Sequence, residues 1–315
     1  MQNCSFVKDF ELEQVADSSY REFIGEVMDR VRNSLGTEYT CSLVQTLKNN
    51  GTKLHGLSVT GSGVEACPMF YLDDYYQDNS AVKTANQIVN QMISLGGDGL
   101  KLPIGVKDIA KFSSVRDSII FKLVGTESNE EMLQSVPHKR LEDLAIIYQI
   151  CVFNDGAQLG TTTIQQGLFD TWGISIEHLH ETALGNTPDK LPAKFRDMRE
   201  VITEMTGMDL TEDDAATPSM CILSNSIGVN GAGVLVYPGE LASIGERIHS
   251  DFYVLPSSVH EVLIIPVSDS VTVDGLAQMV SEVNATQVAP EEVLSNSVYI
   301  YSREDDSFRL AVQAR

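Results

Sequence analysis

Two short, wholly apolar runs, each followed by a proline, most constrain what this chain can fold into. Phe252–Leu255 precedes Pro256, and Val262–Ile265 precedes Pro266. Four-residue runs rich in aromatic and β-branched side chains, without polar alternation, are typical of strands buried on both faces of a sheet. The polar residues between them are therefore expected to form a connection held between two buried strands.

The residues that follow these runs predict a helix and then a closing hairpin. Over residues 273–280, apolar side chains recur at i, i+3, i+4 and i+7, which is the spacing of one helix face. Residues 290–292, Pro-Glu-Glu, have the composition of a second helical start. Alternating residues at 297–301 and 308–312 flank an acidic turn and predict two paired strands.

Paired strands followed by a helix recur along the chain, near residues 40–95, 144–185, 220–250 and 252–287. Hairpins joined by helices imply antiparallel pairing rather than parallel crossovers. The predicted fold class is therefore α+β, with antiparallel sheets built from hairpins, each followed by a covering helix.

Local signals set the bounds of several elements. A helix is predicted over 18–35, and another begins after Ser175 and ends at Gly185. Residues 234–237 are predicted as a strand.

Length and composition limit the domain organisation. A chain of 315 residues corresponds to one or two domains of about 150 residues each. The acidic segment 212–218 is the best candidate linker. It would separate an N-terminal α+β lobe, 1–211, from a C-terminal α+β lobe, 219–315; the alternative is one continuous domain.

Charge excludes one class of partner. The formal net charge is -22, and between residues 201 and 300 Arg247 is the only Lys or Arg against 14 Asp and Glu. A phosphate-binding surface needs clustered cations, so no nucleic acid is expected as a partner. The acidity suits a basic protein partner, DNA mimicry, or only a solvated surface.

Compartment signals favour the cytoplasm. The five cysteines are odd in number and widely spaced, which is neither a disulfide framework nor a zinc site. No stretch has 18 consecutive apolar residues, so no membrane span is expected.

Two short patterns resemble cofactor sites but lack the context that such sites need. The G-x-G-x-x-A run at 61–66 is followed by a strand-like segment instead of a helix. His178 and His180 lie on a predicted helix, where i and i+2 side chains diverge by about 200°. No cofactor and no metal are predicted.

The connection between the two apolar runs holds the candidate catalytic residues, His260, Glu261, Ser257 and Ser258. A serine nucleophile with a histidine base is one interpretation. Adjacent residues of an extended chain point to opposite faces, so Glu261 is badly placed to orient His260. The alternative is that these side chains satisfy backbone groups in a tight connection.

Polar residues after the predicted helix are candidates for hydrogen bonding or acid chemistry toward a ligand: Asn284, Thr286, Gln287, Glu291 and Glu292.

Several runs spread over almost the whole chain resemble an uncharacterised bacterial family, a domain-of-unknown-function family (5688 series) found mainly in gut clostridia. The runs include His55-Gly56, Val136-Pro137-His138, Trp172-Gly173, Asn186-Thr187-Pro188, Leu255-Pro256-Ser257-Ser258 and residues 284–294. The resemblance implies one full-length family domain in the cytoplasm and carries no activity or catalytic residue with it.

Three functions stay open on this sequence. The first is a non-enzymatic cytoplasmic binding or regulatory protein with an acidic C-terminal surface. The second is a hydrolase or transferase that uses His260 with Ser257 or Ser258 and Glu261. The third is a DNA-mimic or anti-defence protein.

Overall fold

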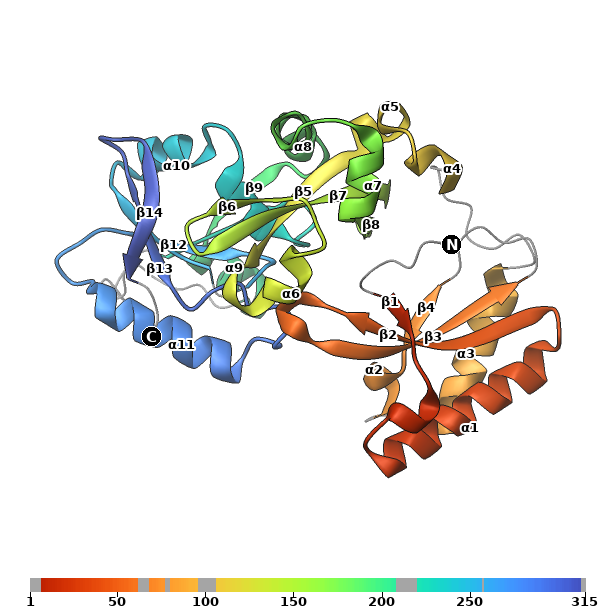
Figure 1. Cartoon of the computed structure of the whole chain (residues 1–315). Helices are drawn as coiled ribbons and strands as arrows, with labels where there is room; N and C mark the ends of the chain where they lie inside the picture. The colour runs from red at the N-terminus through yellow and green to blue at the C-terminus, as the bar shows by residue number, and fades with distance from the viewer. Residues whose placement is uncertain are drawn as a thin grey trace. The chain divides into compact units, whose positions relative to one another are not determined.

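The computed structural model describes residues 7–61, 68–76, 80–95, 106–207, 220–256 and 258–312 of the chain (Figure 1). The chain divides into two compact units, Met1–Ala110 and Lys111–Arg315. Every strand pair in the described residues is antiparallel, in three sheets accompanied by α-helices, which confirms the α+β class. The linker predicted at 212–218 lies outside the described residues, so the boundary between 1–211 and 219–315 stays a prediction.

The first unit is a four-stranded sheet with helices on one face, as Figure 1 shows for α1 and α3. Its elements are β1 Val7–Asp9, η1 Leu12–Gln14, α1 Ser18–Leu35, β2 Tyr39–Leu47, η2 Asn49–Gly51, β3 Lys53–Gly61, β4 Met69–Tyr71, α2 Leu72–Tyr76, α3 Ala81–Leu95 and α4 Val106–Ile109.

Helix α1 has the bounds that its sequence predicts. The Asp17 carboxylate accepts a hydrogen bond from Tyr20 N at 2.8 Å and caps the first turn. Ile24, Val27 and Val31 are wholly buried against the sheet. Burial of three such side chains contributes about 1.5–3 kcal/mol each, which is why this helix forms where its apolar stripe places it.

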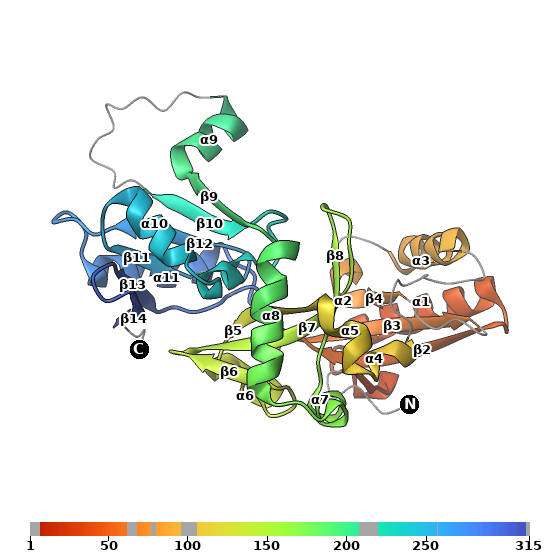
Figure 2. The same cartoon turned by 90° about the horizontal axis from the view of Figure 1, so that it is seen from above.

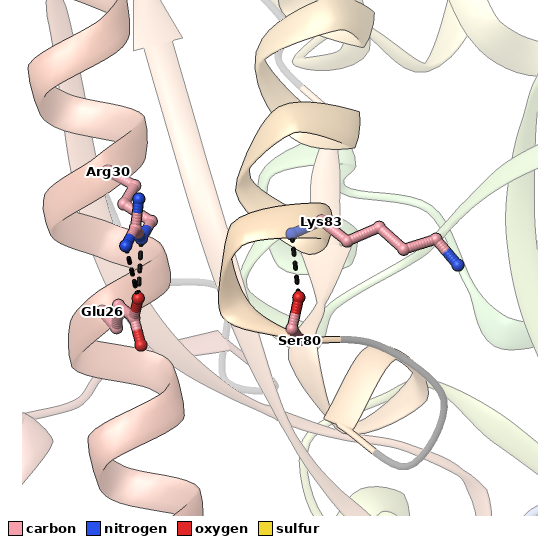
Figure 3. A network of polar contacts seen from close by, with 4 residues as sticks. All are labelled: Glu26, Arg30, Ser80 and Lys83. Carbon is pink, nitrogen blue, oxygen red and sulfur yellow. Dashed lines mark hydrogen bonds and ion pairs between the residues drawn. The ribbon is translucent and has the colours of Figure 1, made fainter.

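Polar contacts on the helices of this unit act locally (Figure 3). Arg30 and Glu26 form an i,i+4 ion pair of 2.7 Å whose side chains are about half exposed. The Ser80 hydroxyl accepts from Lys83 N at the start of α3. An exposed i,i+4 ion pair stabilises a helix by about 0.3–0.5 kcal/mol. These contacts therefore stabilise the helices slightly and do not form a functional site.

The second unit contains the other two sheets. Its first half comprises α5 Phe112–Val115, η3 Arg116–Ser118, β5 Ile119–Gly125, η4 Glu127–Asn129, α6 Glu130–Leu133, β6 His138–Leu141, β7 Leu144–Asn154, β8 Leu159–Thr163, α7 Gln166–Trp172 and α8 Ile176–Lys190. Its second half comprises β9 Ala193–Asp197, α9 Met198–Thr206, β10 Cys221–Asn225, η5 Gly231–Val236, α10 Glu240–Ile248, β11 Phe252–Leu255, β12 Val262–Pro266, α11 Val273–Thr286, β13 Val298–Ser302 and β14 Ser307–Val312.

The six-stranded sheet has the order β14-β13-β11-β12-β10-β9 and places the two apolar runs side by side. Helix α11 packs on Tyr253, Leu255 and Ile265, while α10 lies on the opposite face, as Figures 1 and 2 show. All four residues of β11 are buried, because this central strand has a helix over each face. The prediction of a strand buried on both faces is confirmed for β11, whereas in β12 Leu263 and Pro266 are half-buried.

Three predicted element bounds are wrong. Helix α8 continues through Gly185 and Pro188 to Lys190, because Asn186 Nδ2 donates to the Ile119 carbonyl and Thr187 Oγ1 accepts from Phe121 N, which fix its last turns on β5. Residues 234–237 are not a strand, since 231–236 form the 3-10 helix η5. Residues 290–292 form a turn, because Val293 then bridges to Ser258.

A single carboxylate ties the β6–β7 turn to the strand β13. Ser295 Oγ and Ser297 Oγ donate to Asp143 Oδ2 at 2.9 and 2.8 Å, and the buried Tyr299 hydroxyl donates to Oδ1. Burial raises the pKa of Tyr299 well above its usual range, and the neighbouring Asp143 charge raises it further, so the phenol stays a donor. This cluster, Asp143 with Ser295, Ser297 and Tyr299, is called the Asp143 junction below.

In the described residues, no helix is long and apolar enough to cross a membrane.

We expect the Asp143 junction to act as a unit. Asp143→Asn removes the charge that three hydroxyls share and should lower the free energy of unfolding by about 1.5–3 kcal/mol. Tyr299→Phe should lower it by less, and the double variant should lose less than the sum, because the two changes remove one shared bond. Urea unfolding of the four proteins measures this coupling. Additive losses would contradict the junction.

Gly231 is predicted to tolerate no side chain. A Cβ there would lie 2.3 Å from the His260 carbonyl oxygen and 2.8 Å from Asn225 N, both backbone atoms. Gly231→Ala should therefore lower the free energy of unfolding by about 1–3 kcal/mol. The matched control is Gly185→Ala, which meets nothing within 4 Å inside α8 and should raise it by about 0.5–1 kcal/mol. Equal stabilities in urea would contradict this packing.

Candidate functional site

The β11–β12 connection carries the residues that sequence reasoning selected for catalysis. Ser257 lies outside the described residues. The Ser258 hydroxyl accepts from His260 N at 3.0 Å, which closes a tight turn. Glu261 is exposed and immediately precedes β12. The structure therefore places Ser258, His260 and Glu261 on one short loop, with separate contacts for each.

Both ring nitrogens of His260 are occupied. Nδ1 accepts a hydrogen bond from Asn230 N at 3.3 Å. Nε2 lies 3.3 Å from Glu292 Oε1. An acceptor at Nδ1 requires the neutral ring to carry its proton on Nε2, which faces the Glu292 carboxylate at ion-pair distance. The ring is thus held between a main-chain donor and a carboxylate.

This arrangement is unlike a serine–histidine–acid set. In such a set the acid faces one ring nitrogen and the serine hydroxyl the other. In the described residues, neither the Ser258 hydroxyl nor the Glu261 carboxylate bonds to the His260 ring, and the nitrogen opposite Glu292 holds a backbone N–H. The catalytic roles of Ser258, His260 and Glu261 stay predictions that this geometry does not support, and that of Ser257 stays a prediction outside the described residues.

The polar residues at the end of α11 and in the loop that follows it do not converge with one another. Asn284 is buried and donates to Ser295 O at 3.1 Å and to Asn296 Oδ1 at 2.6 Å. Thr286 is exposed and donates to the Glu282 carbonyl of its own helix, while the Gln287 side chain donates to this threonine and its backbone N donates to Val283 O. Glu291 is half-buried, and Glu292 faces His260. Their binding roles stay predictions.

Main-chain hydrogen bonds join the loop 287–297 to the β11–β12 connection. Val259 N donates to Glu292 O at 2.8 Å, and Ser295 N donates to Pro256 O at 3.1 Å. Ser258 and Val293 form an antiparallel bridge between the same two segments. These main-chain bonds satisfy backbone groups in both loops, and the Ser258 hydroxyl and the His260 ring each accept from a further backbone N–H.

A cavity of about 220 Å³ opens beside Glu261, at the β9–β10 end of the six-stranded sheet. Its walls combine charged and apolar side chains from β9, α9, β10 and the turn that follows: Lys194, Arg196, Val201, Ile222, Ser224, Asn225, Ser226, Ile227, Gly228 and Glu261. Arg196 also pairs with Glu204 on α9. This cavity is called the β9–β10 cavity below.

The turn that follows β10, at one end of this cavity, is held in its conformation by the side chain of Asn225. Asn225 is buried, and its Oδ1 accepts from Ile227 N at 3.1 Å and Gly228 N at 2.8 Å. Its Nδ2 donates to Val229 O at 2.8 Å. Ser224 Oγ donates to His260 O at 2.7 Å and fixes the loop that carries Glu261. The position of Glu261 therefore depends on β10.

Apart from the exposed His249, the other described histidines each contact a neighbouring side chain or carbonyl. His178 and His180 both lie on α8, but His178 meets the Phe112 ring while His180 Nδ1 lies 3.0 Å from the Tyr148 hydroxyl. Burial, with a smaller effect of Lys139, lowers the pKa of His180. In the described residues, no three His, Cys, Asp or Glu side chains gather where they could hold a metal ion.

Two clusters of hydrogen-bonded side chains were not predicted from the sequence. The Asp143 junction had a signal in Ser295, Ser297 and Tyr299, which are spaced i, i+2, i+4 and so share one face of an extended chain. The second joins His55 and Asp73 in the first unit, through His55 N at 2.6 Å and Nδ1 at 3.3 Å. Burial alone would raise the pKa of Asp73, but these hydrogen bonds hold it below the usual value.

We predict that neutral His260 is fixed as its Nε2–H tautomer. Nitrogen-15 NMR of the imidazole at about pH 8, where an unperturbed histidine is neutral, should show an unprotonated Nδ1. Exposed His249 serves as the internal reference and should show averaged tautomers. A protonated Nδ1 at His260 would mean that the Asn230 hydrogen bond is absent and the ring is available as a base.

Comparison with known proteins places the chain in one family. A family model described as a family of unknown function, DUF5688, matches residues 20–303, which is most of the chain and both units. Searches among curated proteins and among solved structures found no match. The chain therefore belongs to the DUF5688 family, whose function is unknown.

Proposed function

We propose that this chain is a non-enzymatic binding protein that receives a basic protein segment on its acidic C-terminal surface. The support begins with the geometry of His260, whose two ring nitrogens already have partners. A base needs a free nitrogen within reach of the proton that it removes. The proposal therefore places function on a surface instead of at the β11–β12 connection.

The described residues of the C-terminal half supply the charge. Residues 220–312 contain 12 Asp and Glu, three Arg and no Lys, a formal charge of 3 − 12 = −9. Arg247, one of the three arginines, lies over the Phe195 ring, with its guanidinium carbon 5.0 Å from the ring centroid. Such a surface attracts cationic partners at a distance and repels nucleic acid.

The outer face of α11 carries the proposal, because it combines acids with exposed apolar side chains. Met279 and Val283, one turn apart, are 42% and 38% exposed. Glu282 and Thr286 lie beside them on the helix surface, and Glu282 accepts from Gln278 at 2.8 Å. We define the α11 outer face as Asp274, Gln278, Met279, Glu282, Val283 and Thr286.

This face suits a basic amphipathic segment. An apolar pair beside a carboxylate complements a segment that has leucine-like side chains beside lysine or arginine. Thr286, selected from the sequence as a binding residue, lies within it.

The arrangement of the acids argues less for DNA mimicry. A mimic needs rows of acids on one exposed face, as phosphates lie along a groove. Exposed Glu246 on α10 and Glu282 on α11 lie instead on opposite layers of the six-stranded sheet. The cytoplasmic location stays a proposal consistent with the spacing of the cysteines.

The test uses a fluorescein-labelled amphipathic helical peptide with lysines on its polar face, and a counterpart with glutamates. Anisotropy should show saturable binding of the lysine peptide that weakens between about 50 and about 300 mM salt. Glu282→Lys and Met279→Ser should each weaken it about five- to tenfold.

Matched controls separate this face from general acidity. Glu246→Lys on α10 makes the same charge change, and Ile93→Ser on α3 removes another exposed apolar side chain. Both should bind within about twofold of the wild type if the contact is local. If the glutamate peptide binds equally, or the α11 variants match their controls, the proposal is wrong.

A further inference from the structure

The β9–β10 cavity exists because one helix is too narrow to cover six strands. Strands lie about 4.8 Å apart, whereas a helix with its side chains is about 10–12 Å wide. The apolar cluster under α11 draws on β11, β12, β13 and β14, with Met220 just before β10, and contains no residue of β9. The sheet face over β9 and β10 is thus left for other side chains to line.

Strand register brings the charged groups of this cavity to one face. Lys194 pairs with Ser224, and Arg196 pairs with Ile222, across β9 and β10. On the other side of β10, Leu223 pairs with Val262, so Glu261 stands next to Ser224. Two cations therefore line one wall, a carboxylate lines the opposite wall, and Ile222 and Ser224 lie between them.

The charged side chains on the two walls do not form ion pairs with each other. In the described residues, neither Lys194 nor Glu261 forms an ion pair within 4.0 Å, while Arg196 is paired with Glu204. A simple anion would meet Glu261, and a simple cation would meet Lys194 and Arg196. A ligand that carries both charges complements both walls.

We infer that the β9–β10 cavity binds a small aliphatic zwitterion of the α-amino acid class. Its carboxylate would face Lys194 and Arg196, its ammonium would face Glu261, and its side chain would contact Val201 and Ile222. The volume of about 220 Å³ corresponds to about seven waters, which suits an amino acid with a branched side chain. Ligand sites for drug-sized molecules are larger, about 300–1,000 Å³. This inference is independent of the α11 outer face.

The first experiment is titration calorimetry of the full chain with leucine, isoleucine and valine. Two analogues test the two charges separately: leucinamide lacks the carboxylate, and N-acetylleucine lacks the ammonium. Each analogue should bind at least about tenfold more weakly than leucine, because each leaves the charge of one wall without a partner. Equal binding of either analogue would overturn the inference, as would the absence of saturable binding by all twenty amino acids at about 10 mM, the weak limit for so small a ligand.

Variants of the wall residues test whether leucine binds in the β9–β10 cavity. Lys194→Met and Glu261→Gln should each weaken leucine binding about tenfold. Lys111→Met and Glu246→Gln make the same chemical changes at exposed positions away from the cavity and should bind as the wild type does. Thermal unfolding without ligand checks that all four variants are folded. Leucine binding that all four variants retain would place the ligand elsewhere and overturn the inference.

Discussion

The interaction on which the rest of the second unit depends is one carboxylate that receives three hydroxyl groups. Asp143 lies in the two-residue turn between β6 and β7, and its main-chain carbonyl also accepts from Thr126 N at 2.9 Å. Its carboxylate accepts from Ser295, Ser297 and Tyr299, which are more than 150 residues away in the chain. A carboxylate with several donors is stable when partly buried, whereas the same donors without it would be left unsatisfied. The junction therefore fixes the start of β13 against the smaller sheet.

Fixing residues 295–299 also fixes what precedes them. The loop 287–297 begins directly after α11, and its C-terminal end is held by the Asp143 junction and by Asn284 of α11, which donates to Ser295 O. A loop fixed in this way presents Glu292 at one position, and the main-chain bonds to Val259 and Pro256 are made from the same loop. His260 then lies between Glu292 and Asn230 N. Its ring completes a chain of contacts that begins at a turn in another sheet.

The elements that the sequence predicted are those whose stability is local or periodic. Helix α1 and strand β11 follow from apolar spacing, because burial of a regular face decides both. Helix α8 passes through Gly185 because Asn186 and Thr187 bond to β5, and no local propensity reports such bonds. The same limit applies to the candidate site. Residue types at 258–261 were visible, but the partners of His260 come from positions 230 and 292, which only the fold brings together.

Electrostatics also accounts for the two cations, Lys194 and Arg196, on β9 at one edge of the six-stranded sheet. Lys194 is the last lysine, and β9 is the last strand of its sheet. A second copy of β9 paired antiparallel about Phe195 would put Lys194 opposite Arg196, and like charges directly opposite destabilise a strand pair. Among the described residues no strand pairs with the outer side of β9, and this charged pair disfavours pairing of that side with a second copy. It also leaves a positive wall facing Glu261 across β10, so one choice of residues on β9 serves both the solubility of the edge and the polarity of the cavity beside it.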